Sequence, residues 1–306
     1  MSQAVPYSIP ASKEEEIEGK VISHFPIGDR NIDTVTVESF GEEWEKFDDF
    51  DQQEIHQVGN EYFDIIDLEA LREARALDVG CGTGRWTKFL AKHVAHIDAI
   101  DPSKAIYPAA KLLREEQNVR LSVAGVSDLP FANDSFDFVF SLGVLHHIPD
   151  TSQAMKDAVS KLRPGGQFLV YLYYSLDNKG AFYKFIFHCS TFFRRMICKM
   201  PQGLKSVVCD IIAFTIYLPF IGLGKLVKAL TPNSKLYQKV PLSYYIGKSL
   251  NIVRNDALDR FGTPLEQRFS RKEIEQMMTE AGLEQIRFSE NTPYWHAVGI
   301  KKSQNQ

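Results

Sequence analysis

The sequence has only four cysteines, Cys81, Cys189, Cys198 and Cys209, and no two of them form a CxxC pair. This spacing argues against a disulfide framework and against a zinc site built from cysteines, so we expect reduced thiols and no bound metal. The first twenty residues also have no apolar core of the kind that a secretory signal needs. Together these absences predict a cytoplasmic protein.

The chain also lacks a large net charge, because 35 Lys and Arg against 39 Asp and Glu leave a balance of −4. We therefore expect no nucleic-acid partner, since binding to a polyanion is favoured by a strongly basic chain. The charge is nevertheless unevenly distributed. Residues 1–70 hold 4 basic and 18 acidic groups, whereas residues 179–235 hold 9 basic groups and a single acid, Asp210. One interpretation is that the acidic segment neutralises the charge of the basic segment.

What the chain does have is a strand, a glycine turn, a helix and a second strand between residues 76 and 101. The apolar run 76–79 predicts a buried parallel strand, and residues 80–84, Gly-Cys-Gly-Thr-Gly, predict a turn with little side chain. Apolar residues recur at helical spacing over 86–93, and the second apolar run ends at Asp101. Such a unit binds a nucleotide: the helix start faces an anionic group, and the carboxylate accepts both ribose hydroxyls. Asp101 could instead only stabilise the turn before a helix that Ser103 caps, and this role is compatible with ribose binding.

The spacing of the glycines decides between cofactors. A dinucleotide fingerprint needs a glycine at position 85, which is Arg85, and this disfavours a nicotinamide oxidoreductase. The GxGxG spacing after Asp78 resembles the first motif of the class I methyltransferases that use S-adenosyl-L-methionine (SAM). The resemblance is closest to small-molecule methyltransferases of the ubiquinone and menaquinone type. It covers about 76–173 and 263–301, including Asp-Leu-Pro-Phe at 128–131, Asp134 to Ser141, and Leu-Arg-Pro-Gly-Gly at 162–166.

This resemblance implies an α/β fold, with a Rossmann-like seven-stranded sheet that is mostly parallel and has its last strand antiparallel. A helical insertion would follow the fifth strand. The resemblance further implies that the Asp128 carboxylate accepts a hydrogen bond from the adenine amino group, although an acid before Leu-Pro is also common in turns. The residues expected to hold SAM are Asp78, Gly80, Cys81, Gly82, Gly84, Asp101, Pro102, Ser127, Asp128 and Leu142.

Two adjacent histidines, His146 and His147, follow the fourth predicted strand, Phe136 to Ser141, at its carboxyl end, where doubly wound sheets bind their ligands. Each is a candidate general base, because an unperturbed histidine titrates near neutral pH. Adjacent side chains point in different directions, so at most one of them faces the reacting atoms. The alternative is that the pair shapes the crevice and hydrogen-bonds the backbone.

We divide the chain into four segments: an acidic arm with lid helices (1–70), a SAM-binding core (71–173), a helical cap insertion (174–262) and the C-terminal part of the core (263–306). Within the insertion, residues 207–224 are apolar apart from Asp210, and their length is close to that of a membrane span. Asp210, Pro219 and two glycines weigh against a spanning helix. Three interpretations stay open: the inner layer of a cap over the substrate site, peripheral contact with a membrane through 180–230, and an interface of a homodimer.

Four residues are candidate substrate contacts. Trp44 shares a helical face with Phe40 and Phe47, a face that could close over the site or simply pack on the core. Tyr245, Arg254 and Asp256 lie in a polar stretch near the end of the insertion, and ordinary surface ion pairs are the alternative for them. The function predicted is methyl transfer from SAM to a small-molecule or lipid-like acceptor. A noncatalytic protein with the same fold, binding SAM or a membrane surface, is the main rival.

Overall fold

The computed structural model describes residues 4–46, 52–176, 180–232, 234 and 236–303. The chain forms two compact units. Unit 1 comprises residues 1–178 and 265–306, and unit 2 comprises residues 179–264.

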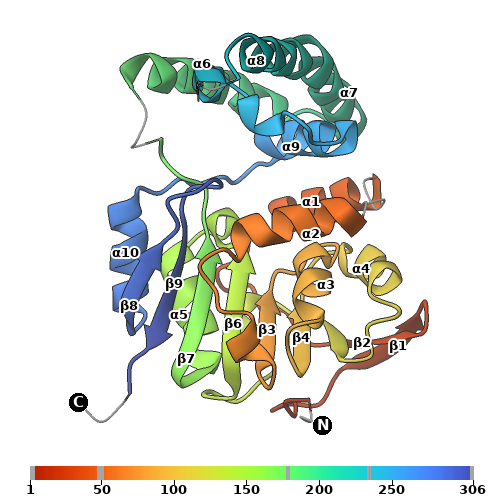
Figure 1. The fold of residues 1–306 in the computed structure, drawn as a ribbon. Helices are drawn as coiled ribbons and strands as arrows, with labels where there is room; N and C mark the ends of the chain where they lie inside the picture. Colours follow the sequence, from red (N-terminus) through yellow and green to blue (C-terminus); the bar gives the residue numbers. More distant parts are fainter. Residues whose placement is uncertain (1–3, 47–51, 177–179, 233, 235, 304–306) are drawn as a thin grey trace. The chain divides into compact units, whose positions relative to one another are not determined.

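Unit 1 is built on a nine-stranded sheet with the order β1-β2-β5-β4-β3-β6-β7-β9-β8 (Figure 1). The prediction of seven strands was wrong, because residues expected to form an acidic arm form the antiparallel hairpin β1–β2, and β2 pairs parallel to β5. The remaining strands are mostly parallel, and β9 is antiparallel to both of its neighbours, as predicted for the last strand. The strands are β1 (Lys13–Ile17), β2 (Lys20–His24), β3 (Arg75–Val79), β4 (His96–Ile100), β5 (Val119–Val123), β6 (Phe136–Leu142), β7 (Leu162–Tyr171), β8 (Leu283–Phe288) and β9 (His296–Lys301).

Helices cover both faces of this sheet, which is why its central strands are continuous apolar runs. Helices α5 and α10 pack on one face together with Val5 and Phe25 of the N-terminal segment. Helices α2, α3 and α4 pack on the other face. The helices of unit 1 are α1 (Thr34–Lys46), α2 (Gln52–Tyr62), α3 (Arg85–Ala91), α4 (Ile106–Leu112), α5 (Thr151–Lys161) and α10 (Arg271–Glu280), with 3₁₀ turns at Glu69–Leu71, Val126–Asp128 and Leu145–His147.

The direction of chain progression reverses between β3 and β6. Strand β3 pairs parallel to β4 on one side and parallel to β6 on the other. The loops that follow β3 and β6 therefore leave the same carboxyl edge and diverge, which creates the crevice where ligands bind in open α/β sheets.

Helix ends follow local signals. The capping box at Ser270 is present, since its hydroxyl accepts from the Glu273 N–H and the Glu273 carboxylate accepts from the Ser270 N–H. Helix α5 is capped by Asp150, whose carboxylate accepts from the Gln153 N–H, and not by Thr151, although threonine is also favoured at this position. The Thr151 hydroxyl donates instead to the Leu145 carbonyl at 3.0 Å.

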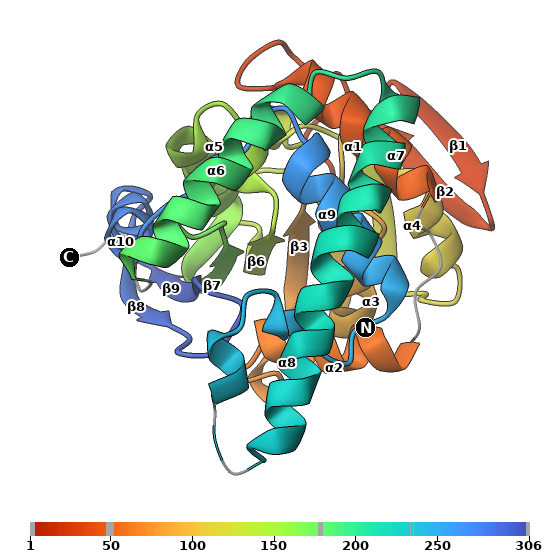
Figure 2. The same cartoon turned by 90° about the horizontal axis from the view of Figure 1, so that it is seen from above.

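Unit 2 is helical in its described residues. Helices α7 and α8 run into each other through a π-helical turn at Ala213–Tyr217, and α9 lies beside them (Figure 2). Helices α7 and α8 together make a continuous helix over Gly203–Leu230, which is long and apolar enough to cross a membrane. The helices of this unit are α6 (Ala181–Ile197), α7 (Gln202–Ile212), α8 (Leu218–Leu230) and α9 (Leu250–Gly262), with 3₁₀ turns at Leu236–Lys239 and Ser243–Tyr245.

Candidate active site

The glycine loop after β3 has three residues in the left-handed region, with φ of 81° at Gly80, 53° at Gly82 and 81° at Gly84. Side chains are strained there, so glycine is required for the conformation itself. At two of the positions the space is also taken by protein: a Cβ on Gly80 would lie 2.4 Å from Val144 Cγ1, and one on Gly84 would lie 2.6 Å from Leu113 Cδ1. The loop is therefore packed into its turn before any ligand arrives.

Asp101 ends β4 and is bound to this loop. Its Oδ2 accepts from the Gly82 N–H at 2.9 Å, while its Oδ1 accepts from the Ser103 N–H and hydroxyl at 2.8 and 2.6 Å. Burial raises the pKa of Asp101, although these hydrogen bonds act in the opposite direction. Both lone pairs of Oδ1 are engaged, so a second ribose hydroxyl could bind this oxygen only if the Ser103 hydroxyl turned away.

Asp78 lies in β3, one residue before the strand ends, and is almost completely buried. Its Oδ2 accepts from the Thr87 hydroxyl of α3 at 2.6 Å. Burial raises its pKa to about 8, and the nearby Asp101 acts in the same direction. The carboxyl group of Asp78 is thus largely protonated at neutral pH, and a cation brought close to it would favour loss of that proton.

One polar atom of the loop has no hydrogen-bond partner among the described residues. It is the Oγ1 of Thr83, a residue that is 3% exposed. Buried hydroxyls are normally paired, and a polar group of a bound ligand would satisfy this one. The loop, Asp78, Asp101 and Thr83 therefore fit a cofactor that carries a ribose and a charged amino-acid end, as SAM does. Thr83 was not among the predicted site residues, and its only signal in the sequence is its place between two glycines.

Ser127 and Asp128 form the 3₁₀ turn after β5, and both contact the N-terminal segment. Asp128 Oδ2 accepts from the Gly28 N–H at 3.0 Å, and Arg30 lies 3.6 Å from its other oxygen. Arg30 also donates to the Ser127 carbonyl at 3.1 Å. Asp128 keeps lone pairs for an adenine amino group, and that role stays a prediction.

The other predicted SAM contacts surround the same crevice. Cys81 is buried in the glycine loop, where burial raises the pKa of its thiol. Pro102 lies between Asp101 and Ser103, and Leu142 is the buried last residue of β6. Their contacts with SAM stay predictions as well.

His146 and His147 occupy the 3₁₀ turn after β6, and their hydrogen bonds assign different tautomers to the two rings. His147 Nδ1 faces the Leu265 carbonyl at 2.7 Å, and since a carbonyl only accepts, Nδ1 carries the proton and the neutral ring has its lone pair on Nε2. His146 Nδ1 accepts from the Tyr173 N–H at 3.4 Å, so its proton lies on Nε2. Burial, His147 and Arg268 hold the pKa of His146 well below its usual range.

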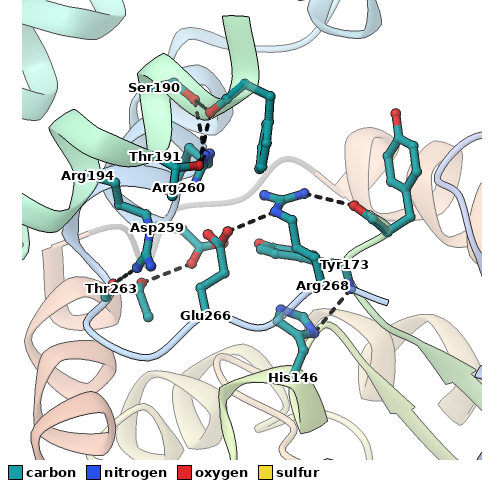
Figure 3. A network of polar contacts seen from close by, with 12 residues as sticks. His146, Tyr173, Ser190, Thr191, Arg194, Asp259, Arg260, Thr263, Glu266 and Arg268 are labelled. Carbon is teal, nitrogen blue, oxygen red and sulfur yellow. Dashed lines mark hydrogen bonds and ion pairs between the residues drawn. The ribbon is translucent and has the colours of Figure 1, made fainter. Parts of the chain in front are cut away.

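His146 is fixed by a stack of side chains that Figure 3 shows from close by. Its ring stacks on Tyr173 at a centroid distance of 3.8 Å, and the Arg268 guanidinium lies 4.9 Å from the Tyr173 ring. Arg268 is held in turn by Glu266 at 2.8 Å and donates to the Tyr174 carbonyl at 3.3 Å. His146 Nε2 has no partner among the described residues, so the stack holds a neutral ring with a hydrogen-bond donor to spare.

Aromatic rings form a continuous row along the carboxyl edge, each contacting the next. Centroid distances are 4.9 Å from Trp86 to Tyr62, 5.2 Å from Tyr62 to Tyr171 and 5.9 Å from Tyr171 to Tyr173. Beyond the two histidines the row ends at Phe40 of α1, 4.8 Å from His147. We call this set the aromatic row; its members are Trp86, Tyr62, Tyr171, Tyr173, His146, His147 and Phe40.

Sequence reasoning missed Tyr62, Tyr171 and Tyr173 as site residues. A signal was present for two of them, since Tyr171 and Tyr173 stand where the fifth predicted strand reaches the carboxyl edge. Helix α1 crosses this edge: a Cβ on Gly41 would lie 3.3 Å from the backbone of Lys104, and Thr36 accepts from the Leu265 N–H at 3.2 Å. The side chain of Trp44 in the same helix lies outside the described residues.

The three substrate candidates from the insertion all lie in unit 2 and contact partners there. Arg254 makes a bidentate ion pair with Asp210, with both N–O distances 2.9 Å. The Tyr245 hydroxyl donates to Asp256 at 2.9 Å. These contacts tie α9 to α7 and to the 3₁₀ turn before it, and a role of the three residues toward a substrate stays a prediction.

Comparison with known proteins agrees with this geometry. Residues 77–170 match the family model described as a methyltransferase domain. Two curated relatives are ubiquinone biosynthesis O-methyltransferases. The one of Coxiella burnetii is 31% identical over 111 residues, and the one of Marinobacter nauticus is 31% identical over 133 residues. These alignments cover 36% and 42% of this chain and 46% and 55% of the relatives. The chain thus spans about half the length of the curated relatives it matches.

Among solved structures, human N-acetylserotonin methyltransferase in complex with SAM is similar with a TM-score of 0.50 at 14% identity. The alignment covers 86% of this chain and 57% of that one, and it supports the Rossmann-like fold. These matches confirm the resemblance seen in the sequence, and with it the enzyme class and the cofactor expected of residues 77–170. No group of three or more histidine, cysteine or acidic side chains is placed to hold a metal among the described residues.

Proposed function

Since residues 77–170 are a SAM-dependent methyltransferase domain, we propose that the whole chain transfers a methyl group from SAM to a hydroxyl group of a small, apolar or lipid-like acceptor. The observation that carries this proposal is the aromatic row beside the glycine loop, with His147 held in one tautomer inside it. The printed names of two curated relatives, O-methyltransferases of ubiquinone biosynthesis, also favour an oxygen acceptor.

The cofactor supplies a methyl group that is already activated by the positive sulfur to which it is attached. The protein therefore mainly has to bind SAM and the acceptor, align them and exclude water, and it has less need to create a reactive group. Asp101 and the glycine loop would hold the ribose and the charged end, and Asp78 would lie near the cationic amino group. Asp128 would accept from the adenine.

The acceptor side is apolar and aromatic. Tyr62 and Tyr171 are each partly buried, and aromatic rings of this kind suit packing against a flat, apolar molecule, whereas the Tyr173 ring is stacked on His146 and covered by Arg268. Helix α1 places Phe40 at the end of this surface. An acceptor with a ring or a short prenyl-like chain suits such a wall better than a sugar or an amino acid does.

His147 would act as the general base. A hydroxyl acceptor has to lose its proton as the new carbon–oxygen bond forms, and the lone pair on His147 Nε2 can take it. The Leu265 carbonyl keeps that lone pair in place by binding the proton on Nδ1 at 2.7 Å. His146 carries its proton on Nε2 and has a depressed pKa, so it suits a donor role and not that of a base.

Label transfer tests the acceptor class. SAM with a labelled methyl group would be incubated with the protein and a lysate of the source cell, and the products separated into organic and aqueous phases. We expect the label in the organic phase, in a product that a strong base does not demethylate, as for an ether. Label in the aqueous phase alone would contradict the apolar acceptor.

Calorimetry tests the cofactor side without any acceptor. Asp101→Ala removes the carboxylate expected to bind the ribose and should weaken SAM binding about tenfold or more. Ser103→Ala is the matched control, because it removes a hydroxyl that competes for Asp101 Oδ1 and should leave SAM affinity equal or higher. An unchanged affinity in Asp101→Ala, with the thermal unfolding curve intact, would contradict the assignment.

A further inference from the structure

Large apolar side chains are exposed mainly in unit 2. Among the described residues of unit 1, those that are exposed are Ile9, Val21, Ile27 and Val35. In unit 2 they occur on every long helix, with Leu250 alone on α9 and many on the other helices, and several of them expose more than half of their surface. They include Phe185, Phe192, Phe193 and Met196 of α6, and Leu204, Val207, Ile211, Phe214, Ile216, Leu218, Phe220, Leu223, Leu226 and Leu230 of the continuous helix.

The continuous helix has two different faces. Its packed face is formed by side chains spaced by three or four residues, Lys205, Cys209, Ala213, Tyr217, Ile221 and Gly224, which are all buried. The opposite face carries the exposed leucines, isoleucines and phenylalanines. A surface helix of a water-soluble domain has the reverse arrangement, with its apolar stripe turned inward.

The polar side chains of unit 2, by contrast, form hydrogen bonds and ion pairs between its helices. The Asp210–Arg254 pair joins α7 to α9, and Lys205 Nζ donates to the Gly262 carbonyl at 3.3 Å. Figure 3 shows Arg260 donating to the hydroxyls of Ser190 and Thr191 on α6, both at 3.1 Å. Asp259 accepts from the Thr263 hydroxyl at 3.0 Å. The polar contacts thus hold the helices together while apolar side chains face outward.

The charge that remains at the surface is of one sign. Residues 179–264 contain thirteen Lys and Arg but only three acids, Asp210, Asp256 and Asp259. None of these acids is exposed, and each is hydrogen-bonded within the unit. Arg195, Lys199, Lys225 and Lys228, in contrast, are exposed on or just after the helices that carry the apolar residues.

We propose that this surface of unit 2 binds an anionic lipid bilayer, with the apolar side chains of α6 and α7–α8 inserted at the headgroup boundary. The lysines and arginines would contact lipid phosphates. Exposed aromatic and aliphatic side chains, neighbouring exposed cations, and acids that are all internally bound are the features that such a partner recognises. A second protein would need a matching acidic and apolar surface, whereas a bilayer offers both at once.

The helices lie on the bilayer and do not cross it. A spanning helix would have to carry the Lys205 and Asp210 side chains, together with the charged helix α9 to which they are bound, into the hydrocarbon. Only the outward face of Gly203–Leu230 is free of such contacts among the described residues. Length and composition alone would have allowed a span, and the packing decides against it.

Vesicle binding of the full-length chain tests the proposal. Vesicles of phosphatidylcholine with and without phosphatidylglycerol would be separated by flotation at low and high salt. We expect binding to the anionic vesicles, weaker binding at high salt and little binding to phosphatidylcholine alone. K225E/K228E should reduce binding about 25-fold or more, since each cation near an anionic surface changes partitioning about fivefold. F192S/F193S should reduce it about tenfold or more.

The matched controls are K92E/K272E, which makes the same charge change on exposed lysines of unit 1, and Val21→Ser, which removes an exposed apolar side chain there. Neither control should change binding. Failure of the wild type to bind anionic vesicles would overturn the proposal, and this result needs no variant to fold. A dimer that F192S/F193S dissociates while vesicle binding persists would also overturn it, because a second copy would then cover the surface.

This test is independent of the proposed methyl transfer. SAM affinity measured by calorimetry without lipid reports on unit 1 alone. A chain that binds SAM but no vesicles would contradict only the lipid surface, and a chain that binds vesicles but no SAM would contradict only the proposed function.

Discussion

The two units use the same kinds of side chain in opposite places. In unit 1 the phenylalanines of the central strands β6 and β7, Phe136, Phe138, Phe140 and Phe168, are fully buried. In unit 2 the phenylalanines at 192, 193, 214 and 220 are exposed, while the acids are bound between helices. Burial of apolar surface stabilises a unit only if its surroundings are less apolar than its interior. The lipid surface proposed for unit 2 would account for this contrast.

Removing unit 2 should separate SAM binding, which we expect of unit 1, from vesicle binding, which we expect of unit 2. In unit 1 the two chain segments that flank the junction are joined to each other, because the Ser175 N–H donates to the Phe269 carbonyl at 2.9 Å. Replacing residues 180–262 with a short glycine-serine linker should therefore leave SAM affinity unchanged, as measured by calorimetry, and abolish vesicle binding. Insoluble protein after this deletion would show that unit 2 completes the core of unit 1, and the contrast would fail.

Substitutions of His146 and His147 should show which of the two histidines takes part in methyl transfer. With an acceptor fraction that takes up label, His147→Gln should lower the rate of methyl transfer about 100-fold or more, because the base is lost. His146→Gln should lower it less than about tenfold, since the glutamine amide can replace one hydrogen-bond donor. SAM affinity of both variants is the control and should not change. Equal losses in the two variants would contradict the tautomer assignment.

Asp78→Asn should produce a smaller effect, on stability, that depends on pH. Burial raises the pKa of Asp78 to about 8, whereas an unfolded aspartate has a pKa of about 3.9. Between these values the native state holds a proton that the unfolded state has released, so this residue makes stability fall as pH rises. Without SAM, the gain in Tm of Asp78→Asn over the wild type should grow from about pH 5 to about pH 8, reaching a few degrees. A gain that does not change with pH would contradict the raised pKa.

The sequence predicted the inner sheet because buried parallel strands are continuous apolar runs with glycine or proline at their ends. Strand β3 was predicted within one residue at either end, and β4 ends where the second apolar run was expected to end, before Asp101. The glycine loop was also visible, since it depends on residues only a few positions apart. Local rules act over such distances and can be read from one sequence.

The features that the sequence did not predict depend on distant segments. Strand β1, Lys-Glu-Glu-Glu-Ile, is too polar to be recognised, and β2 pairs with a strand nearly a hundred residues later. The aromatic row brings together rings from five separate parts of the chain. The tautomer of His147 depends on Leu265, 118 residues away. No local pattern contains these contacts, because they arise only when the sheet has assembled.

The outer strands of the sheet have a further consequence, for how copies of this protein meet. An exposed strand offers unpaired backbone groups to any other strand and so invites growth of the sheet from one molecule into the next. At one border, β1 presents Glu14 and Glu16 to solvent, and two such borders would repel each other. At the other, the register of β8 shifts between Glu284 and Arg287, and Gln285 adopts a φ of 51°. We therefore expect the acidic run near the start of the chain to oppose edge-to-edge association of the sheets, and any self-association of the folded protein to use another surface.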